Sequence, residues 1–378
     1  MDIVLVPGPQ PDGAAWEPVA TMIKKAGHRP HPLAWAPADQ VAAVVSVIDT
    51  CSTQVLLVGH AEGAGIAYAA LDARPDRVVR LIMVDGSAPP PPLTDPAGLD
   101  VPVTIADSAA PPLSGDEPSG GLSKIKEVER LWLPADPRPD DLAGIILGSV
   151  PVTGKQFVEA GGTGDWRLGM GGAGAHFTAS SFGQGLALAT KLADLADGGN
   201  RRIDVDLRRE GVTVTLDLRF SSFIHRDIEV ARRISAAAGE VGMSADPSKL
   251  HSLNIMFHPT AESIRPFWQA ALGWDERGEE DLADPLRRGP NVQFFGLEEI
   301  KPGDPQFHLD VTVGHDVAEA RVAAVVAAGG RLVNDKFAPF WWTLADAEGN
   351  LVDIATGVGR EEHWGWPFAP DDPAAEPD

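Results

Sequence analysis

The sequence predicts an α/β unit followed by α+β units, and three observations support this fold class. Short apolar runs within residues 2–84 alternate with helical patterns, which is typical of a doubly wound parallel sheet. Residues 204–208 and 212–218 alternate between apolar and polar side chains, as antiparallel strands do. Residues 249–357 contain two copies of a pattern of one strand, one helix and three strands.

The individual elements follow from local patterns. Apolar side chains at helical spacing predict helices at 15–26, 39–50, 65–74, 182–196, 226–241 and 317–328. Continuous apolar runs or strict alternation predict strands at 2–6, 55–58, 79–84, 204–208, 212–218, 251–257 and 308–313.

Changes in composition divide the chain into five segments. A stretch rich in Pro, Gly, Ser and Asp separates the first unit from the rest, and we interpret it as a linker or the remnant of a lid. The predicted segments are 1–88, the linker at 89–121, a second unit at 122–246, a third unit at 247–360 and an acidic tail at 361–378.

Charge and cysteine content restrict the partners and the compartment. The chain has 378 residues, a net charge of −23 and one cysteine. Nucleic acids and anionic membranes are themselves negative, so we expect neither as a partner and expect a small-molecule substrate instead. A single cysteine forms no internal disulfide, and the sequence shows neither a signal peptide nor an apolar run of about 20 residues. We therefore expect a cytoplasmic protein.

Residues 59–63 read Gly-His-Ala-Glu-Gly between an apolar strand and a helix of small residues. Residues 1–87 resemble the α/β-hydrolases, whose Gly-x-Ser-x-Gly turn carries a nucleophilic serine. Ala61 stands in the serine position, and a methyl group cannot attack a carbonyl, so we expect no serine hydrolase activity. A complete α/β-hydrolase has two further strands whose ends carry an acid and a histidine, and the sequence does not show them. This predicts a truncated sheet that packs against the rest of the chain or against another subunit, as in a homo-oligomer.

Residues 165–243 resemble the pterin-4a-carbinolamine dehydratases through Asp165-Trp166-Arg167, Phe177, the helix from Phe182, the segment 200–216 and Arg226-Asp227-Ile228. That family uses a His-His-Pro motif and a later histidine as acid and base. These positions hold Arg201, Arg202 and Ile203, and the later one falls near Arg219. Arginine stays protonated at neutral pH, so the resemblance implies an inactive dehydratase site. The arginines then either bind an anion or are surface charges.

Residues 249–357 resemble the vicinal-oxygen-chelate superfamily of the glyoxalase and bleomycin-resistance type. The resemblance is carried by Pro266-Phe267-Trp268, Leu272-Gly273-Trp274, His308-Leu309-Asp310-Val311 and Asp346-Ala347-Glu348-Gly349-Asn350. It implies paired βαβββ modules that curl into a cup and bind a divalent metal through His, Glu or Asp. His308 and Asp353 match two ligand positions and His251 a third, while the fourth, near Gln293, lacks a carboxylate. A cup with a divalent metal and a metal-free binding cup both stay open.

The cup is the candidate site because the other two units lack their reactive groups. Alternation places His308, Asp310 and Thr312 on one strand face, directed into the cup, with Asp353 on the last strand of the same module. We expect His308 and Asp353 to be catalytic. The expected substrate-binding residues are His251, Phe295, Trp341, Trp342, Arg201 and Arg202.

The first functional hypothesis is an enzyme of specialised metabolism, such as antibiotic biosynthesis. It would act as a lyase, cyclase or isomerase on an aromatic or polycyclic small molecule. One alternative is a non-catalytic protein that binds a small molecule and confers resistance. The other is a residual 4a-carbinolamine dehydratase. Fold alone does not decide among the three.

Overall fold

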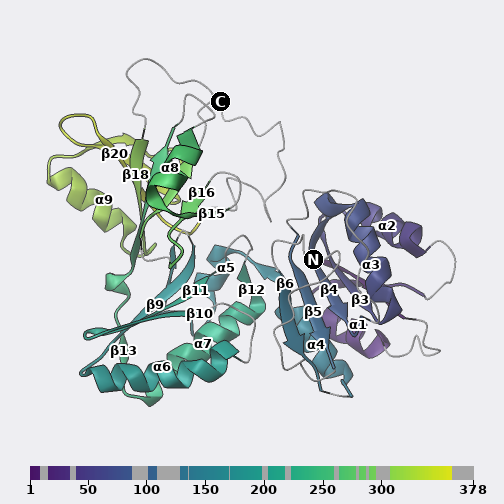
Figure 1. Ribbon diagram of the computed structural model, residues 1–378. Coiled ribbons are helices and arrows are strands. Elements are labelled where there is room, and N and C mark those ends of the chain that lie inside the picture. Colours follow the sequence, from purple (N-terminus) through teal and green to yellow (C-terminus); the bar gives the residue numbers. More distant parts are fainter. Residues whose placement is uncertain are drawn as a thin grey trace.

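In its described residues, the computed structural model contains three large sheets that follow one another along the chain, and a two-stranded one (Figure 1). It describes residues 1–8, 16–34, 40–86, 101–108, 128–134, 136–169, 171–197, 203–217, 223–258, 264–277, 281–286, 289–294 and 307–359. The predicted combination of α/β and α+β architecture is confirmed by a parallel first sheet and a mixed third sheet. No helix in the described part of the chain is long and apolar enough to cross a membrane.

The first sheet is parallel and has the strand order β2-β1-β3-β4-β5-β6. Its strands are β1 (Asp2–Val6), β2 (Arg29–Pro32), β3 (Val55–His60), β4 (Val78–Val84), β5 (Val103–Asp107) and β6 (Val128–Trp132). The helices α2 (Gln40–Thr50) and α3 (Glu62–Ala73) bury one face. The helices α1 (Trp16–Lys25) and α4 (Pro139–Gly148) bury the other. The apolar runs of β1 and β3 follow from this burial on both faces.

The prediction of a truncated sheet with an uncovered face is wrong. β5 lies within the stretch predicted as linker, and β6 and α4 lie within the predicted second unit. Each of these strands has five residues; β5 is buried between β4 and β6, and β6 forms the edge of the sheet. The surrounding Pro, Gly and Asp concealed them because such short runs give little periodicity.

The second sheet is antiparallel, with the order β10-β11-β9-β13 and β8 paired to β9. Its strands are β8 (Trp166–Gly169), β9 (Gly172–Thr178), β10 (Ile203–Arg208), β11 (Gly211–Asp217) and β13 (Ser244–Ala245). The helices α6 (Phe182–Asp197) and α7 (His225–Glu240) contribute to the same core. A short helix α5 (Gly154–Glu159) and the pair β7 (Pro151–Val152) and β12 (Phe223–Ile224) complete this part. The predicted strands and helices agree with these bounds to within about two residues.

The third sheet has the order β15-β16-β17-β14-β18-β21-β20-β19, in which two similar halves meet at β14 and β18. The first half contains β14 (His251–Phe257), α8 (Ile264–Leu272), β15 (Asp275–Arg277), β16 (Asp281–Ala283) and β17 (Asn291–Phe294). The second contains β18 (Phe307–Val313), α9 (Ala318–Ala327), β19 (Arg331–Asn334), β20 (Trp341–Ala345) and β21 (Leu351–Ala355). Each half is a strand, a helix and three strands, as the internal repeat predicts.

A buried carboxylate joins the first sheet to the second unit. Glu129 on β6 is 3% exposed, and its Oε1 accepts a hydrogen bond of 2.7 Å from Nη1 of Arg226 on α7. Its Oε2 lies 3.8 Å from Nη1 of Arg80, a buried side chain on β4, and accepts a hydrogen bond from Thr104. Farther along, Arg167 on β8 forms two hydrogen bonds to the carboxylate of Asp316, which precedes α9.

We predict that Glu129→Ala destabilises the full chain by about 3–5 kcal/mol, the usual cost of removing one partner from a buried ion pair. The substitution removes the acceptor that both Arg80 and Arg226 face. Urea denaturation monitored by tryptophan fluorescence measures the change. Glu159→Ala is the control, because Glu159 is exposed at the end of α5. Equal stability of the two variants would contradict the role of Glu129.

Candidate functional site

The two faces of the third sheet differ in chemistry. The helices α8 and α9 pack on one face against apolar side chains of alternate strand positions. The opposite alternate positions carry polar side chains, and we call this side the polar face. Its polar members in the described residues include Asn254, Gln293, His308, Asp310, Thr312, Thr343 and Asp353. Strand pairing places Asp310 beside both Asn254 and Asp353, and Thr343 beside Asp353.

Two histidines and a carboxylate form a chain on the polar face. His258 follows the end of β14, and its Nε2 lies 2.9 Å from Nδ1 of His308. The second ring nitrogen of His308, Nε2, lies 3.4 Å from Oδ2 of Asp353. The two imidazole rings are stacked, with centroids 4.9 Å apart. One proton can therefore be passed between an imidazole and a carboxylate along this chain.

A second carboxyl group lies beside this chain. Burial and, to a smaller extent, the neighbouring carboxylate of Asp353 together raise the pKa of Asp310 to about 7, against a lowering effect of His308. Oδ1 of Asp310 and Oδ1 of Asp353 are both buried and have no hydrogen-bond partner among the described residues. The polar face thus contains one carboxyl group that holds its proton near neutral pH and another that faces an imidazole.

The other half of the sheet adds amide groups to the polar face. The side-chain amide of Gln293 donates to both carboxylate oxygens of Asp281, at 2.9 and 3.1 Å. Its carbonyl oxygen accepts a longer contact of 3.5 Å from Asn254, which is almost fully buried. The position near Gln293, expected to lack a carboxylate, therefore has Asp281 beside it.

The structure brings together only part of the predicted site. His308 and Asp353 are neighbours as expected, and Trp341 shares their face because its partner on β21, Ala355, is two residues from Asp353. His251 is wrongly placed by the prediction: it is exposed and pairs with Val313, whose side chain packs with α9. Trp342 also packs on the α9 side and is not a member of the polar face. Phe295, Arg201 and Arg202 lie outside the described residues.

The expected metal ligands do not fit one ion. His251 lies on the wrong face, and both ring nitrogens of His308 are directed to other side chains. A three-ligand set of His308, Asp353 and His251 is therefore not assembled.

The turn after β3 keeps the backbone of a nucleophile elbow. Ala61 has φ 51° and ψ −124°, a conformation that is strained for a residue with a side chain. A Cβ on Gly59 would lie 2.5 Å from Cα of Ala64, and one on Gly63 would collide with the carbonyl oxygens of Val6 and Pro7. The two glycines are thus needed for close packing of α3, while the residue between them carries a methyl group.

The side chains around this elbow do not complete a hydrolase triad. Burial raises the pKa of Asp107, which stands at the carboxyl end of β5, a strand end that we did not recognise in the sequence. Burial lowers the pKa of His60, whose ring meets Trp16 edge to face. The next histidine along the chain is His176, which lies in the second sheet and contacts Thr213. Among the described residues, neither a nucleophile nor a histidine base is therefore assembled at Ala61.

A match to a family model supports the glyoxalase resemblance of the third unit. Residues 254–355 match the family model of a glyoxalase-like domain, so the third unit is glyoxalase-like. No curated protein matches this chain. The family match lies outside residues 165–243 and gives no support to the dehydratase resemblance.

Several solved structures are similar to part of the chain. A pyrethroid hydrolase from Sphingobium faniae JZ-2 is 23% identical over 24% of this chain and 42% of its own, with a TM-score of 0.22. An N-formylmaleamic acid deformylase from Pseudomonas putida S16 is 16% identical over 38% and 89%, with a TM-score of 0.30. An extracellular α/β-hydrolase from a Paenibacillus species is 14% identical over 39% and 98%, with a TM-score of 0.31. This chain spans about two fifths of the length of the pyrethroid hydrolase.

We predict that the purified protein does not cleave p-nitrophenyl esters above the rate of a heat-denatured control, because Ala61 supplies no nucleophile. His60→Ala should leave this background rate unchanged. Measurable ester turnover that disappears in His60→Ala would show that the elbow uses another group for catalysis.

A second prediction concerns the stability of the third unit against pH. The folded state keeps the proton of Asp310 up to a pKa of about 7, whereas the ordinary pKa of an aspartic acid is 3.8, so the unfolded chain releases the proton at lower pH. Stability is therefore lost as the pH rises between these values. Asp310→Asn should raise the free energy of unfolding at pH 8 by a few kcal/mol, since one pKa unit corresponds to about 1.4 kcal/mol, and change it little at pH 4.

Denaturation midpoints of parent and variant across this pH range test the prediction. Asp275→Asn, at an exposed position of the same unit, is the matched control. A gain for Asp310→Asn that is the same at pH 4 and pH 8 would contradict the assignment.

Proposed function

We propose that this chain is an enzyme that binds a small molecule at the polar face of the third sheet and moves protons within it. The observation that carries the proposal is the grouping of His258, His308, Asp310 and Asp353. The resulting reaction class is isomerisation, cyclisation or elimination, as in a lyase, cyclase or isomerase of specialised metabolism. These reactions need an acid and a base but no redox group.

The two aspartates divide the acid and base roles. The raised pKa of Asp310 lets it hold a proton near neutral pH and donate it to a carbonyl or leaving oxygen. Asp353 faces the imidazole of His308 with one oxygen, and its other oxygen has no partner in the described part of the protein. This second oxygen can take a proton from a carbon atom of the substrate. The His308–His258 pair can then compensate for the loss of negative charge on Asp353. In one turnover Asp310 gives one proton to the substrate and Asp353 takes one from it, so the number of protons balances.

The polar face also suggests the kind of substrate. Trp341 is stacked on Phe337, with ring centroids 4.1 Å apart, and shares the face of Asp353. A flat aromatic surface beside acidic and imidazole groups suits an aromatic or polycyclic carbonyl compound. The amides of Asn254 and Gln293 add hydrogen-bonding groups for its oxygens.

Proton exchange at carbon tests the proposal. The full chain is incubated in D₂O with a panel of aromatic and polycyclic ketones, and deuterium incorporation next to the carbonyl is measured by mass spectrometry. We expect incorporation with the parent protein and a loss of about 10²–10⁴-fold in Asp353→Asn, the usual contribution of a placed acid or base. Asp310→Asn and His308→Ala should also reduce it.

His251→Ala is the matched control, since this histidine lies on the same strand pair but on the opposite face. Its rate should equal that of the parent. Tight binding of panel members without exchange would favour the alternative of a non-catalytic binding or resistance protein. Unchanged exchange in both Asp353→Asn and His308→Ala would place the site elsewhere.

A further inference from the structure

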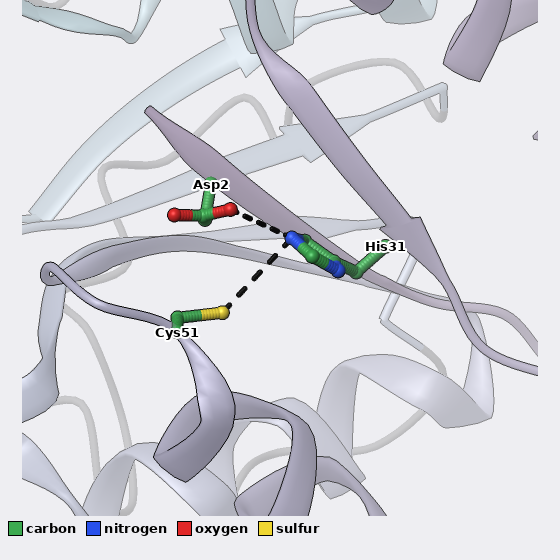
Figure 2. Close-up of side chains that lie close together, drawn as sticks. All are labelled: Asp2, His31 and Cys51. Atoms are coloured by element: carbon green, nitrogen blue, oxygen red, sulfur yellow. Dashed lines mark hydrogen bonds and ion pairs between the residues drawn. The ribbon is translucent and has the colours of Figure 1, made fainter.

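Three potential metal ligands converge at the edge of the first sheet, far along the chain from the polar face. Asp2 begins β1, His31 belongs to the edge strand β2, and Cys51 directly follows α2 (Figure 2). Oδ1 of Asp2 lies 2.7 Å from Nε2 of His31, and Sγ of Cys51 lies 4.0 Å from the same nitrogen. The three ligand atoms all lie within 4.8 Å of one another. In the described residues this is the one such group of three His, Cys, Asp or Glu side chains.

We propose that Asp2, His31 and Cys51 form a binding site for one zinc ion. A thiolate, an imidazole nitrogen and a carboxylate oxygen are the donors that zinc takes in proteins, and this mixture disfavours Mg²⁺ and Ca²⁺. Cys51 would bind as the thiolate and release its proton to solvent. The inference is independent of the function proposed for the third unit.

The convergence on one nitrogen argues for a metal rather than for a nucleophile. In a catalytic relay, the acid and the nucleophile contact different ring nitrogens of the histidine. Here the carboxylate and the sulfur both approach Nε2 of His31, so no relay can pass through the ring. Three donor atoms gathered around one point are an arrangement that a cation can occupy in place of the Asp2–His31 hydrogen bond (Figure 2).

The distances are close to those of a tetrahedral site. Zinc bond lengths imply donor separations of roughly 3.4 Å for oxygen to nitrogen and roughly 3.6 Å for nitrogen to sulfur. The observed separations are 2.7 and 4.0 Å, so one is too short and the other too long. A single small movement of the His31 ring, away from Asp2 and toward Cys51, corrects both.

The surroundings leave room for this movement and for a fourth ligand. Asp2 is 2% exposed and Cys51 8%, so both are fixed by the core, whereas the side chain of His31 is 35% exposed on an edge strand. Arg29 pairs with Oδ2 of Asp2 and leaves Oδ1 for the ion. Its own side chain is largely exposed and can move away from the cation. Three protein ligands and one position open to water are typical of non-structural zinc sites.

Titration with cobalt tests the site, because Co²⁺ replaces zinc and gives a sulfur-to-metal charge-transfer absorption. The chain has one cysteine, so this absorption can come from Cys51 alone. We expect the chelator-treated full chain to bind one equivalent of Co²⁺ with this band, and added Zn²⁺ to abolish the band. Cys51→Ala should lose the band completely, and His31→Ala and Asp2→Asn should weaken binding on the order of a hundredfold or more.

Two variants serve as controls. His28→Asn changes a histidine just before β2 that is not part of the group, and Asp353→Asn changes the polar face of the third sheet; both should keep the band. Zn²⁺ should also raise the thermal midpoint of the parent but not of Cys51→Ala. Absence of the band in folded parent protein, or one equivalent of Co²⁺ bound equally by Cys51→Ala, would overturn the proposal.

Discussion

The antiparallel pairing of β14 with β18 is the constraint on which the candidate site depends. This pairing runs over seven residues and sets Asn254 opposite Asp310 and Met256 opposite His308. Because side chains alternate along a strand, a slip of one residue would turn the polar set toward α8 and α9 and the apolar set away from them. The apolar clusters beneath the two helices therefore fix the register, and the register in turn places the aspartates and histidines on one face.

The same arrangement has an energetic cost that a ligand would relieve. Asp310 and Asp353 are side by side in register, and each has a buried oxygen with no partner within the described chain. A buried polar atom without a hydrogen bond destabilises a fold by about 1–3 kcal/mol. Buried polar atoms without partners are commonly found where a substrate supplies the missing hydrogen bonds. The unpaired oxygens of Asp310 and Asp353 therefore support the chemistry proposed for these two carboxyl groups.

Sequence patterns predicted regular elements and faces well, and contacts between distant segments poorly. Alternation alone put His308 and Asp310 on one face, and the structure has them there. It could not show that His258, one residue past a strand, would reach His308, since that contact depends on the pairing of β14 with β18. Alternation also places His251 on the opposite face from Asn254. The prediction set this signal aside because His251 matched a ligand position of the chelate superfamily. Asp2, His31 and Cys51 come from three separate elements, and only the folded sheet brings them together.

The turn at Ala61 shows that close packing alone can hold a strained backbone. Backbone strain of this kind usually marks a functional site, because the surrounding structure must hold it in place. Here the surroundings are packing contacts: Gly63 lets the start of α3 lie directly against the carbonyls of Val6 and Pro7, and Gly59 lets β3 approach Ala64. Relaxing the turn would move α3, whose buried face contributes to the core of the first sheet. The conformation of Ala61 is therefore required by the fold itself and does not by itself indicate catalysis.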